Sequence, residues 1–501
     1  MAGSPPPQPS LAGKSSALSA AAAGPRAAVL GVDIGRTGLE LVVLAGDGTI
    51  LATHRRAYPG DHAPDRPGDP SDWWRAVRTG TKDILRRAGI DASAVRAVGL
   101  TGEHACVAID KNGEVLADAV LGCDRRDQVG LDALLASVGA RTLANLAGGP
   151  PELGCSAVQL LALRDREKRA WHDLRHLLAP KDFIRLRLCS TIGTDPSDAA
   201  ASLLFNPRTR TWSKQVMTLL GLDPIILPTV GPSHSLGGRI TENAAKEAGL
   251  IAGTPVTTGA GRLPSMAIAA GATTAGSVIL ELGGLGGLMV TTAEAVRDPD
   301  GRFSTGCAAT AGLSSLVAND RTGGAATDWV LETVLTELSS QARRQGRDPL
   351  LALAETAADA PAGADGLRWR QERCGGHLVG LQAHHSRAHV ARAAIEGGAL
   401  AARALLARLE HLKVPTERIY VAGSGAAAPL WCQVAADVLD REVWSIAVPE
   451  AAALGAAVLA AGAVGLHKKN TVAKAPPWLQ CWTPRKAAVA LYHTPDDSSA
   501  P

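Results

Sequence analysis

Small residues dominate this chain of 501 residues, which contains 54 Gly beside 10 Trp, 3 Tyr and 3 Phe. The length suggests two to four domains at about 100–200 residues each, and 46% hydrophobic with 20% charged residues can form sizeable cores, which excludes wholesale disorder. With 51 Lys+Arg against 48 Asp+Glu the net charge is only +3, which argues against nucleic acid or an anionic membrane as a partner and favours a small molecule.

The first predicted structured element is a β-hairpin. Residues 1–26 before it are rich in Pro, Ser, Ala and Gly, lack the pattern of a secretory signal, and are predicted to be a disordered tail. A buried strand at 28–32, a turn at 33–38 and a second strand at 39–44 predict a hairpin with a glycine-rich tip. The same pattern of strand, glycine turn and strand returns at 277–292.

This internal repeat predicts the domain organisation. One supersecondary unit near the start of each half indicates two related α/β domains that face each other across a cleft. We place an N-terminal domain at 27–253, a C-terminal domain at 254–466 and a C-terminal extension at 467–501. The α/β pattern is completed by a strand at 95–100 and by helical stretches at 71–88, 157–170, 325–337, 388–410 and 429–439.

The C-terminal part of the chain and the cysteines indicate in which compartment of the cell the protein is expected. The longest apolar run, 451–466, is shorter than the about 20 residues that span a bilayer and predicts a buried helix, so no membrane segment is expected. The Trp- and Tyr-bearing part of the extension is expected to dock back on the body. The eight cysteines form no C-x-x-C pair and no zinc or disulfide spacing, which favours a reducing cytoplasm.

The turn after the first strand is a candidate phosphate site. Asp33 stands at the strand end, and Gly35, Thr37 and Gly38 follow it in a D-x-G-x-x-G pattern. Glycines let backbone N–H groups approach an anion, and an aspartate can hold a hydrated magnesium ion. Because ordinary hairpins carry the same pattern, the motif alone leaves both interpretations open.

Two further glycine turns are weaker candidates. The turn that begins with Gly283 and Gly284 has only one nearby carboxylate, which lies within the strand. The third turn, with Gly423, Gly425 and Ala426, lies between a strand and a helix, so its backbone donors lie at a helix N-terminus suited to a nucleotide. Tight strand-to-helix packing explains the third turn equally well, but three such turns in this order are less expected by chance than any one.

Polar residues in the first half are candidates for contacts with a sugar-like ligand. His104, and Asp124 with Arg126, each follow a strand-like run. Aspartate and arginine can fix hydroxyl groups through charge-assisted hydrogen bonds. A surface ion pair between Asp124 and Arg126, with a solvated His104, is the competing interpretation.

Two sets of motifs lie in the two halves of the chain. They comprise residues 178–187, 194–200 and 212–213, and residues 376–381, 389–390 and 393–396. The first set is similar to the xylulokinase pattern P-K-D-Y-L-R-L-R, T-D-x-S-D-A and W-S, and the second to the C-terminal signature of the FGGY carbohydrate kinases. Over about residues 28–466 the chain thus resembles this family, most closely its xylulokinase branch. The resemblance implies a two-domain fold of the actin-like ATPase (ribonuclease H-like) superfamily, with sugar in the N-terminal domain and ATP mainly in the C-terminal one.

The resemblance also implies roles by position. Asp33 matches the aspartate near the metal and the phosphates. The other residues that match nucleotide and phosphate contacts are Gly35, Thr37, Gly38, Gly283, Gly284, Gly423, Gly425 and Ala426. Those that match sugar contacts are His104, Asp124 and Arg126. The implied cofactors are ATP and Mg²⁺, if binding is retained.

The catalytic position departs from the family pattern. FGGY kinases carry an aspartate, in G-x-G-D-N, that accepts the proton of the attacking sugar hydroxyl, and residues 259–264 here read Gly-Ala-Gly-Arg-Leu-Pro. The base position is therefore Arg262, whose guanidinium cannot accept that proton. General-base help is typically worth about 10²–10⁴ in rate, and by this match no catalytic residue is retained.

Other residues at predicted ligand-binding positions also differ from the family pattern. The second phosphate turn, G-T-S-G in the family, reads Gly-Gly-Leu-Gly at 283–286, so both hydroxyl donors are lost. Arg36 and Glu40 stand in the first turn where small polar and Lys residues are usual, and the tryptophan of the sugar loop is Gly122. The scaffold motifs persist while these ligand elements have changed.

The sequence therefore predicts an FGGY pseudokinase that retains binding of a nucleotide, a sugar or a sugar phosphate. Arg36 and Arg262 favour an anionic ligand, unless both are simply solvated. Two alternatives stay open: an active ATP-dependent pentulose kinase that recruits another carboxylate, and a structural or regulatory subunit without a ligand. The expected partners are small molecules, with no nucleic acid and no membrane, and a homodimer stays open.

Overall fold

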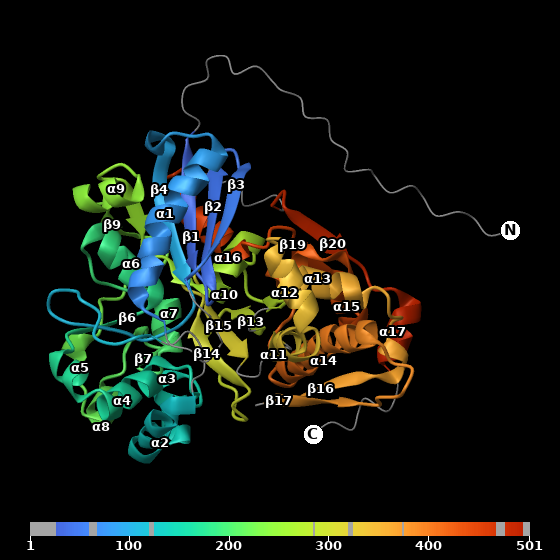
Figure 1. The fold of residues 1–501 in the computed structure, drawn as a ribbon. Coiled ribbons are helices and arrows are strands. Elements are labelled where there is room, and N and C mark those ends of the chain that lie inside the picture. The colour runs from blue at the N-terminus through green and yellow to red at the C-terminus, as the bar shows by residue number, and fades with distance from the viewer. Residues whose placement is uncertain are drawn as a thin grey trace.

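In the residues that the structure describes, two large mixed β-sheets have helices between and around them, as the computed structural model shows (Figure 1). Three further sheets have two strands each. This arrangement confirms the predicted α/β class. The structure describes residues 27–59, 68–119, 125–283, 286–318, 324–372, 375–466 and 476–493. The predicted tail at 1–26 lies outside the described residues.

The first sheet contains the N-terminal hairpin, and its strand order is β3-β2-β1-β4-β10-β9 with β11 beside β4. β1 pairs antiparallel with β2 and parallel with β4. Every residue of β1 is buried, as expected for a central strand covered on both faces. The strands are β1 (Ala28–Ile34), β2 (Gly38–Ala45), β3 (Ile50–Ala57), β4 (Val95–Gly102), β9 (Leu236–Arg239), β10 (Pro255–Thr257) and β11 (Ala260–Gly261).

The second sheet repeats this arrangement, in the order β14-β15-β13-β12-β18-β19-β20. β12 pairs antiparallel with β13 and parallel with β18, as β1 pairs with β2 and β4, so the repeat seen in the sequence is a structural repeat. The strands are β12 (Ser277–Glu281), β13 (Gly287–Thr292), β14 (Phe303–Cys307), β15 (Ser314–Ala318), β18 (Arg418–Ala422), β19 (Val443–Ile446) and β20 (Leu479–Trp482). The division of the chain at 253/254 stays a prediction.

The five predicted helical stretches are all helical, but two of them are interrupted. Residues 157–170 divide at Glu167 into α4 and α5, and residues 325–337 pass through a π-helical turn at Val330–Val334. Apolar periodicity reports a buried face and cannot locate a break of one residue. The helices at these stretches are α1 (Pro70–Ala88), α4 (Ser156–Arg166), α5 (Lys168–Asp173), α11 (Gly324–Trp329), α12 (Thr336–Arg344), α14 (Arg387–His411) and α15 (Pro429–Leu439).

An apolar layer joins the two sheets. α10 (Arg262–Ala270) and α16 (Ala451–Ala463) lie between them (Figure 1), in one cluster with Val29 of the first sheet and Ile279 of the second. The backbones of β1 and α16 approach each other closely, because a Cβ on Gly31 of β1 would lie 1.9 Å from the carbonyl oxygen of Ala453. Part of the glycine and alanine excess therefore permits strand and helix to approach each other.

Two glycines of α16 should respond oppositely to the same substitution. A Cβ on Gly455 would lie 1.7 Å from the carbonyl oxygen of Ser265, whereas a Cβ on Gly462 meets nothing within 4 Å. We expect Gly455→Ala to lower the free energy of unfolding by about 1–3 kcal/mol through overpacking. Gly462→Ala is the matched control and should raise it by about 0.5–1 kcal/mol, because alanine favours helix. Urea denaturation measures both, and equal effects would contradict the close contact.

The C-terminal extension docks on the body, as predicted, over residues 476–493. β20 adds to the second sheet beside β19, and the hydroxyl of Tyr492, in α17 (Lys486–Tyr492), donates to Glu396 Oε1 at 2.6 Å. The rest of the extension, 467–475 and 494–501, lies outside the described residues.

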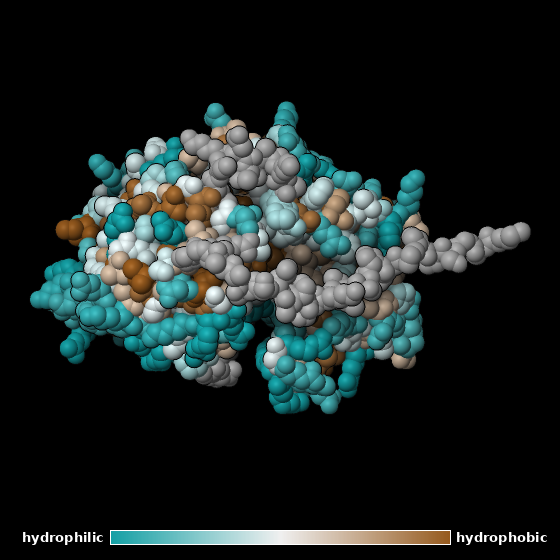
Figure 2. Space-filling model, turned by 90° about the horizontal axis from the view of Figure 1, so that it is seen from above, coloured by the Kyte–Doolittle hydropathy of each residue, from teal (hydrophilic) through white to brown (hydrophobic). Residues whose placement is uncertain are grey.

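Residues 451–463 of the apolar run form α16, which is buried between the sheets as predicted. Within the described part of the chain, no helix combines the length and apolar character that a membrane span requires. Seen from above, the surface carries many hydrophilic residues and is indented between two lobes (Figure 2).

Candidate functional site

Arg262, at the predicted base position, is the centre of a three-carboxylate cluster between the two sheets. Its Nε lies 3.2 Å from Asp33 Oδ2, its Nη1 lies 3.3 Å from Glu103 Oε1, and Nη1 also pairs with Glu281. Asp33 is near the end of β1, Glu103 follows the parallel strand β4, and Glu281 ends β12. The ends of strands from both halves therefore place the three carboxylates around Arg262.

The electrostatics of this Arg262 cluster hold the guanidinium charged. Burial disfavours its charge, but Glu281, Glu103 and Asp33 outweigh burial and raise the pKa of Arg262. Burial also raises the pKa of Asp33 and of Glu281, although Arg262 opposes both shifts. Arg262 is the first residue of α10, where the helix dipole disfavours a cation, so the carboxylates also offset that cost.

The cluster does not fit a magnesium ion held by Asp33. One oxygen of Asp33 already contacts the guanidinium, and a metal on the other would bring two cations together. In the residues that the structure describes, no group of three or more His, Cys, Asp or Glu side chains is arranged to hold a metal ion. The predicted metal role of Asp33 thus requires Arg262 to move away.

The first glycine turn is a hairpin turn. Gly35 N donates to Gly38 O at 3.1 Å, and the carbonyl of Thr37 accepts from Tyr58 N at 3.2 Å. Arg36 extends from this turn to Asp328 of α11, with Nη2 and Oδ2 2.9 Å apart. Arg36 is therefore paired with a carboxylate of the other half, and the phosphate-binding role of the turn stays a prediction.

Arg55 of β3 forms a second bridge between the halves. Its guanidinium lies 3.1 Å from Glu40 Oε1, 2.6 Å from Asp348 Oδ2 and 3.0 Å from Glu450 Oε1, and it donates to Ser424 Oγ at 3.2 Å. Ser424 belongs to the third glycine turn, so Arg55 connects the first sheet to this predicted nucleotide-binding turn. Glu40, one of the departures from the family pattern, is part of this bridge.

Glu40 should make stability depend on pH. Burial raises the pKa of Glu40 to about 7 against the opposing effect of Arg55, and Asp33 adds to the rise. A carboxyl whose pKa is raised by folding stabilises the fold below its unfolded value, and that contribution is lost as the pH rises toward 7. We expect the free energy of unfolding to fall by up to about 3 kcal/mol between pH 4.5 and 7.

Glu40→Gln should flatten this pH dependence, measured as urea midpoints at several pH values. Glu355→Gln, which removes an exposed carboxylate that pairs with Arg347, is the matched control and should keep the slope. An unchanged slope in Glu40→Gln would contradict the raised pKa.

The third glycine turn is tightly packed against its neighbours. Gly425 N donates to Leu282 O at 2.9 Å, Ala426 N donates to Gly423 O at 3.0 Å, and Gly423 has a φ of 87°. A Cβ on Gly425 would lie 2.8 Å from Leu282 and from Trp431. These glycines are needed for strand-to-helix packing, and nucleotide binding by them stays a prediction.

The second glycine turn is only partly described. Gly283 has a φ of 88°, which favours glycine, and its carbonyl accepts from Gly286 N at 3.1 Å. Gly284 lies outside the described residues.

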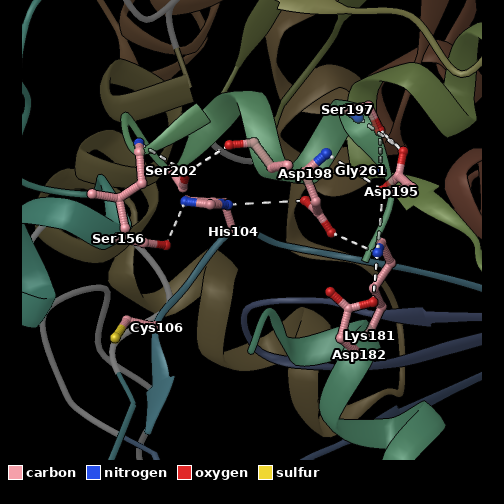
Figure 3. A network of polar contacts seen from close by, with 12 residues as sticks. His104, Cys106, Ser156, Lys181, Asp182, Asp195, Ser197, Asp198, Ser202 and Gly261 are labelled. Atoms are coloured by element: carbon pink, nitrogen blue, oxygen red, sulfur yellow. Dashed lines mark hydrogen bonds and ion pairs between the residues drawn. The ribbon is translucent and has the colours of Figure 1, made fainter. Parts of the chain in front are cut away.

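On the predicted sugar side, the structure describes His104 and Arg126 but not Asp124 or Gly122. His104 follows β4, and its Nε2 lies 2.9 Å from Ser156 Oγ at the start of α4 (Figure 3). Arg126 is exposed in a short helical turn at Arg125–Asp127. The structure therefore does not test the predicted Asp124 and Arg126 pair.

A buried ion network lies beside His104. Lys181 Nζ, in α6 (Pro180–Cys189), is 2.8 Å from Asp182 Oδ1, 3.2 Å from Asp195 Oδ1 and 3.1 Å from Asp198 Oδ2 (Figure 3). Lys181 and Asp195 have no exposed surface. Burial opposes the charge of Lys181, but the three carboxylates outweigh it and raise its pKa.

The same network positions the residue before Arg262. Gly261 N donates to Ser197 Oγ at 2.9 Å, and Ser197 Oγ donates to Asp195 Oδ2 at 2.6 Å. Asp195 is the N-cap of α7 (Pro196–Ala201). The first set of family-like motifs is therefore a buried scaffold that fixes the start of α10.

Sequence reasoning missed several residues that meet at these sites. Glu103 directly precedes His104 at a predicted strand end, and Glu281 is the one acid of a buried strand, so both carried a local signal. Ser156 and Arg55 carried none, because Ser156 meets His104 across 52 residues and Arg55 meets Asp348 across 293 residues of the chain.

The comparisons with known proteins agree with this fold. Models of the N-terminal and C-terminal domains of the FGGY family of carbohydrate kinases match residues 28–268 and 282–464. The chain belongs to the FGGY family.

Individual proteins of known sequence or structure are similar to this chain over most of its length. The chain is 25% identical over 466 residues to the xylulose kinase of Staphylococcus epidermidis, covering 88% of each chain. It is also 25% identical over 460 residues to the autoinducer-2 kinase of Yersinia enterocolitica, covering 88% of this chain and 87% of the relative. The solved xylulose kinase of Rhodospirillum rubrum superposes with a TM-score of 0.76 at 26% identity, covering 93% and 96%. The predicted two-domain fold and the xylulokinase-like character are confirmed.

Proposed function

We propose that this protein is an FGGY pseudokinase, which keeps the kinase fold and has lost efficient phosphoryl transfer. The observation that carries the proposal is the placement of Arg262. Its guanidinium cannot accept the proton of a sugar hydroxyl, and it contacts Asp33, the residue that matches the metal and phosphate aspartate. One substitution thus affects both the base and the metal position.

The ligand that the charges around Arg262 favour differs from the sequence expectation. Arg36, Arg55 and Arg262 are each paired with carboxylates, so none of them offers uncompensated positive charge to a phosphate. The Arg262 cluster alone holds three carboxylates against one guanidinium. Unscreened negative charge of this kind opposes a nucleotide polyanion, which favours weak nucleotide binding and a neutral sugar or polyol over a sugar phosphate.

A second candidate function is favoured by Glu103. The carboxylate of Glu103 lies 3.3 Å from the guanidinium at the base position. In the sequence, Glu103 directly precedes His104, the residue that matches a sugar contact. The side chain of Glu103 is 16% exposed, more than that of Asp33 or Glu281 in the same cluster. An active ATP-dependent kinase of a small carbohydrate would use Glu103 as the general base.

Coupled measurement of ADP formation, with pentuloses and polyols and with ATP and Mg²⁺, separates these functions. The pseudokinase proposal predicts rates at least 10²-fold below the about 1–100 s⁻¹ of ordinary kinases. Turnover within that range that is lost in both Asp33→Ala and Glu103→Gln would overturn it in favour of the second function. The change in melting temperature with each ligand measures binding. If no ligand changes the melting temperature, the remaining function is that of a structural or regulatory subunit.

A cytoplasmic location is part of the same proposal. In the described part of the chain no disulfide joins any cysteines, which is in keeping with reducing conditions.

A further inference from the structure

Ser156, His104 and Asp198 lie in line beside the buried ion network (Figure 3). Ser156 Oγ is 2.9 Å from His104 Nε2, and the other ring nitrogen, Nδ1, is 3.9 Å from Asp198 Oδ1. A serine hydroxyl on one ring nitrogen and a carboxylate facing the other is the arrangement that lets histidine remove the hydroxyl proton while serine attacks a carbonyl carbon. The three residues come from the start of α4, the loop after β4 and α7.

The surroundings of Asp198 favour the required tautomer of His104. Burial acts to raise the pKa of Asp198, but Lys181 and His104 outweigh it and lower the pKa below its ordinary value. The resulting carboxylate can only accept hydrogen bonds, so it favours a proton on Nδ1 and leaves Nε2 to accept from Ser156. Nδ1 is buried without a hydrogen-bond partner, and a movement of about 1 Å would bring it within reach of Asp198.

The start of α4 supplies donors for a developing oxyanion. Ser156 is the first residue of this helix of 11 residues, and the first intrahelical bond runs from Gln159 N to Cys155 O. Ala157 N donates to Ser202 O, whereas the N–H groups of Ser156 and Val158 have no acceptor within the helix. Backbone donors at a helix N-terminus stabilise negative charge where a tetrahedral intermediate forms.

An apolar pocket adjoins the serine. Ser156 and His104 share its lining with Leu177, Leu204 and Trp212, and its cavity volume is about 30 Å³. This is room for about one or two water molecules. A short acyl group therefore enters only when the lining side chains move, and a long chain does not fit.

We propose that Ser156, His104 and Asp198 form a nucleophilic serine site that hydrolyses small carboxylic esters. In the first half-reaction Ser156 Oγ bonds to the ester carbonyl carbon while its proton passes to His104 Nε2. The bond between that carbon and the alkoxy oxygen then breaks, and the leaving oxygen takes the proton from Nε2. In the second half-reaction water gives a proton to Nε2 and its oxygen bonds to the acyl carbon, and Ser156 leaves with that proton. The carboxylic acid is released, and no nucleotide is consumed.

The test uses p-nitrophenyl acetate with the full chain. We expect a burst of nitrophenolate, an acetyl group on the peptide that contains Ser156, and a loss of at least about 100-fold in ester hydrolysis in Ser156→Ala. His104→Phe should lose the burst as well. The matched control, Ser213→Ala, removes another buried serine hydroxyl at a helix start of the same half, that of α8 (Lys214–Leu220), and should keep the rate.

Equal rates in the wild type and in Ser156→Ala, or acetylation at other residues only, would overturn the proposal. Because a variant can fail to fold, labelling of the wild type with a fluorophosphonate and mapping of the labelled peptide gives an independent result, and absence of label at Ser156 also counts against it. These assays contain no ATP, so their outcome is separate from that of the kinase assay.

Discussion

Arg262→Asp, which restores the residue type of the family at the base position, is expected to destabilise the protein without creating a kinase. The new carboxylate would face Asp33, Glu103 and Glu281 with no cation between them. Removing one partner of a buried ion pair costs about 3–5 kcal/mol, because the other charges stay buried and uncompensated. We expect a loss of this size in urea unfolding at pH 7, with ATP turnover still below the kinase range.

The pH dependence identifies the cause. The pKa of Asp33 and of Glu281 is already raised by burial, and an added carboxylate raises it further. Protonation relieves the repulsion, so the deficit of Arg262→Asp should be smaller at pH 5 than at pH 7. Arg343→Asp, at an exposed pair with Glu332, is the matched control and should cost no more than about 1 kcal/mol.

Two results would contradict this account. A variant as stable as the wild type would show that the Arg262 cluster does not stabilise the fold. A gain of ATP turnover of at least 10²-fold would show that the missing base is the main lesion, since general-base help is worth about 10²–10⁴.

The sequence predicted the parts of the fold that are determined locally. The strand at 28–32 and the helix at 429–439 are continuous patterns of one period, and β1 (Ala28–Ile34) and α15 (Pro429–Leu439) follow them closely. The repeated hairpin was visible because glycine turns mark both copies. Breaks such as that at Glu167 depend on tertiary packing and leave little trace in periodicity.

The candidate site was predictable only in part, for a related reason. The identity of Arg262 was read from its position in a motif, but two of its three partners, Asp33 and Glu281, lie 229 and 19 residues away and meet it through the packing of two sheets. The sequence favoured an anionic ligand for Arg36 and Arg262, with two solvated arginines as the alternative. In the structure each is already paired with carboxylates, because charge balance in a cleft is a property of the assembled fold.

Lys181→Met is expected to have an effect as large as that of Arg262→Asp. The side chain is fully buried, and its ammonium group lies within 3.2 Å of carboxylates from Asp182, Asp195 and Asp198. Methionine keeps much of the volume but leaves these carboxylates facing one another, which costs about 3–5 kcal/mol. The measurement is the free energy of unfolding from urea denaturation, with Lys168→Met, at an exposed lysine, as the control with little effect.

A double variant tests whether charge rather than packing is the cause. Adding Asp198→Asn to Lys181→Met removes one of the uncompensated carboxylates, whereas Asp182 keeps Arg185 as a partner at 3.4 Å. The double variant should therefore be more stable than Lys181→Met alone. No recovery in the double variant would indicate that the loss comes from packing. Because the network also holds Gly261 through Ser197, a charge-driven loss should be accompanied by a weaker Arg262 cluster, seen as a flatter pH dependence of stability. The buried network and the Arg262 cluster would then be one coupled unit, which explains why the motifs that build the scaffold persist beside a base position that has changed.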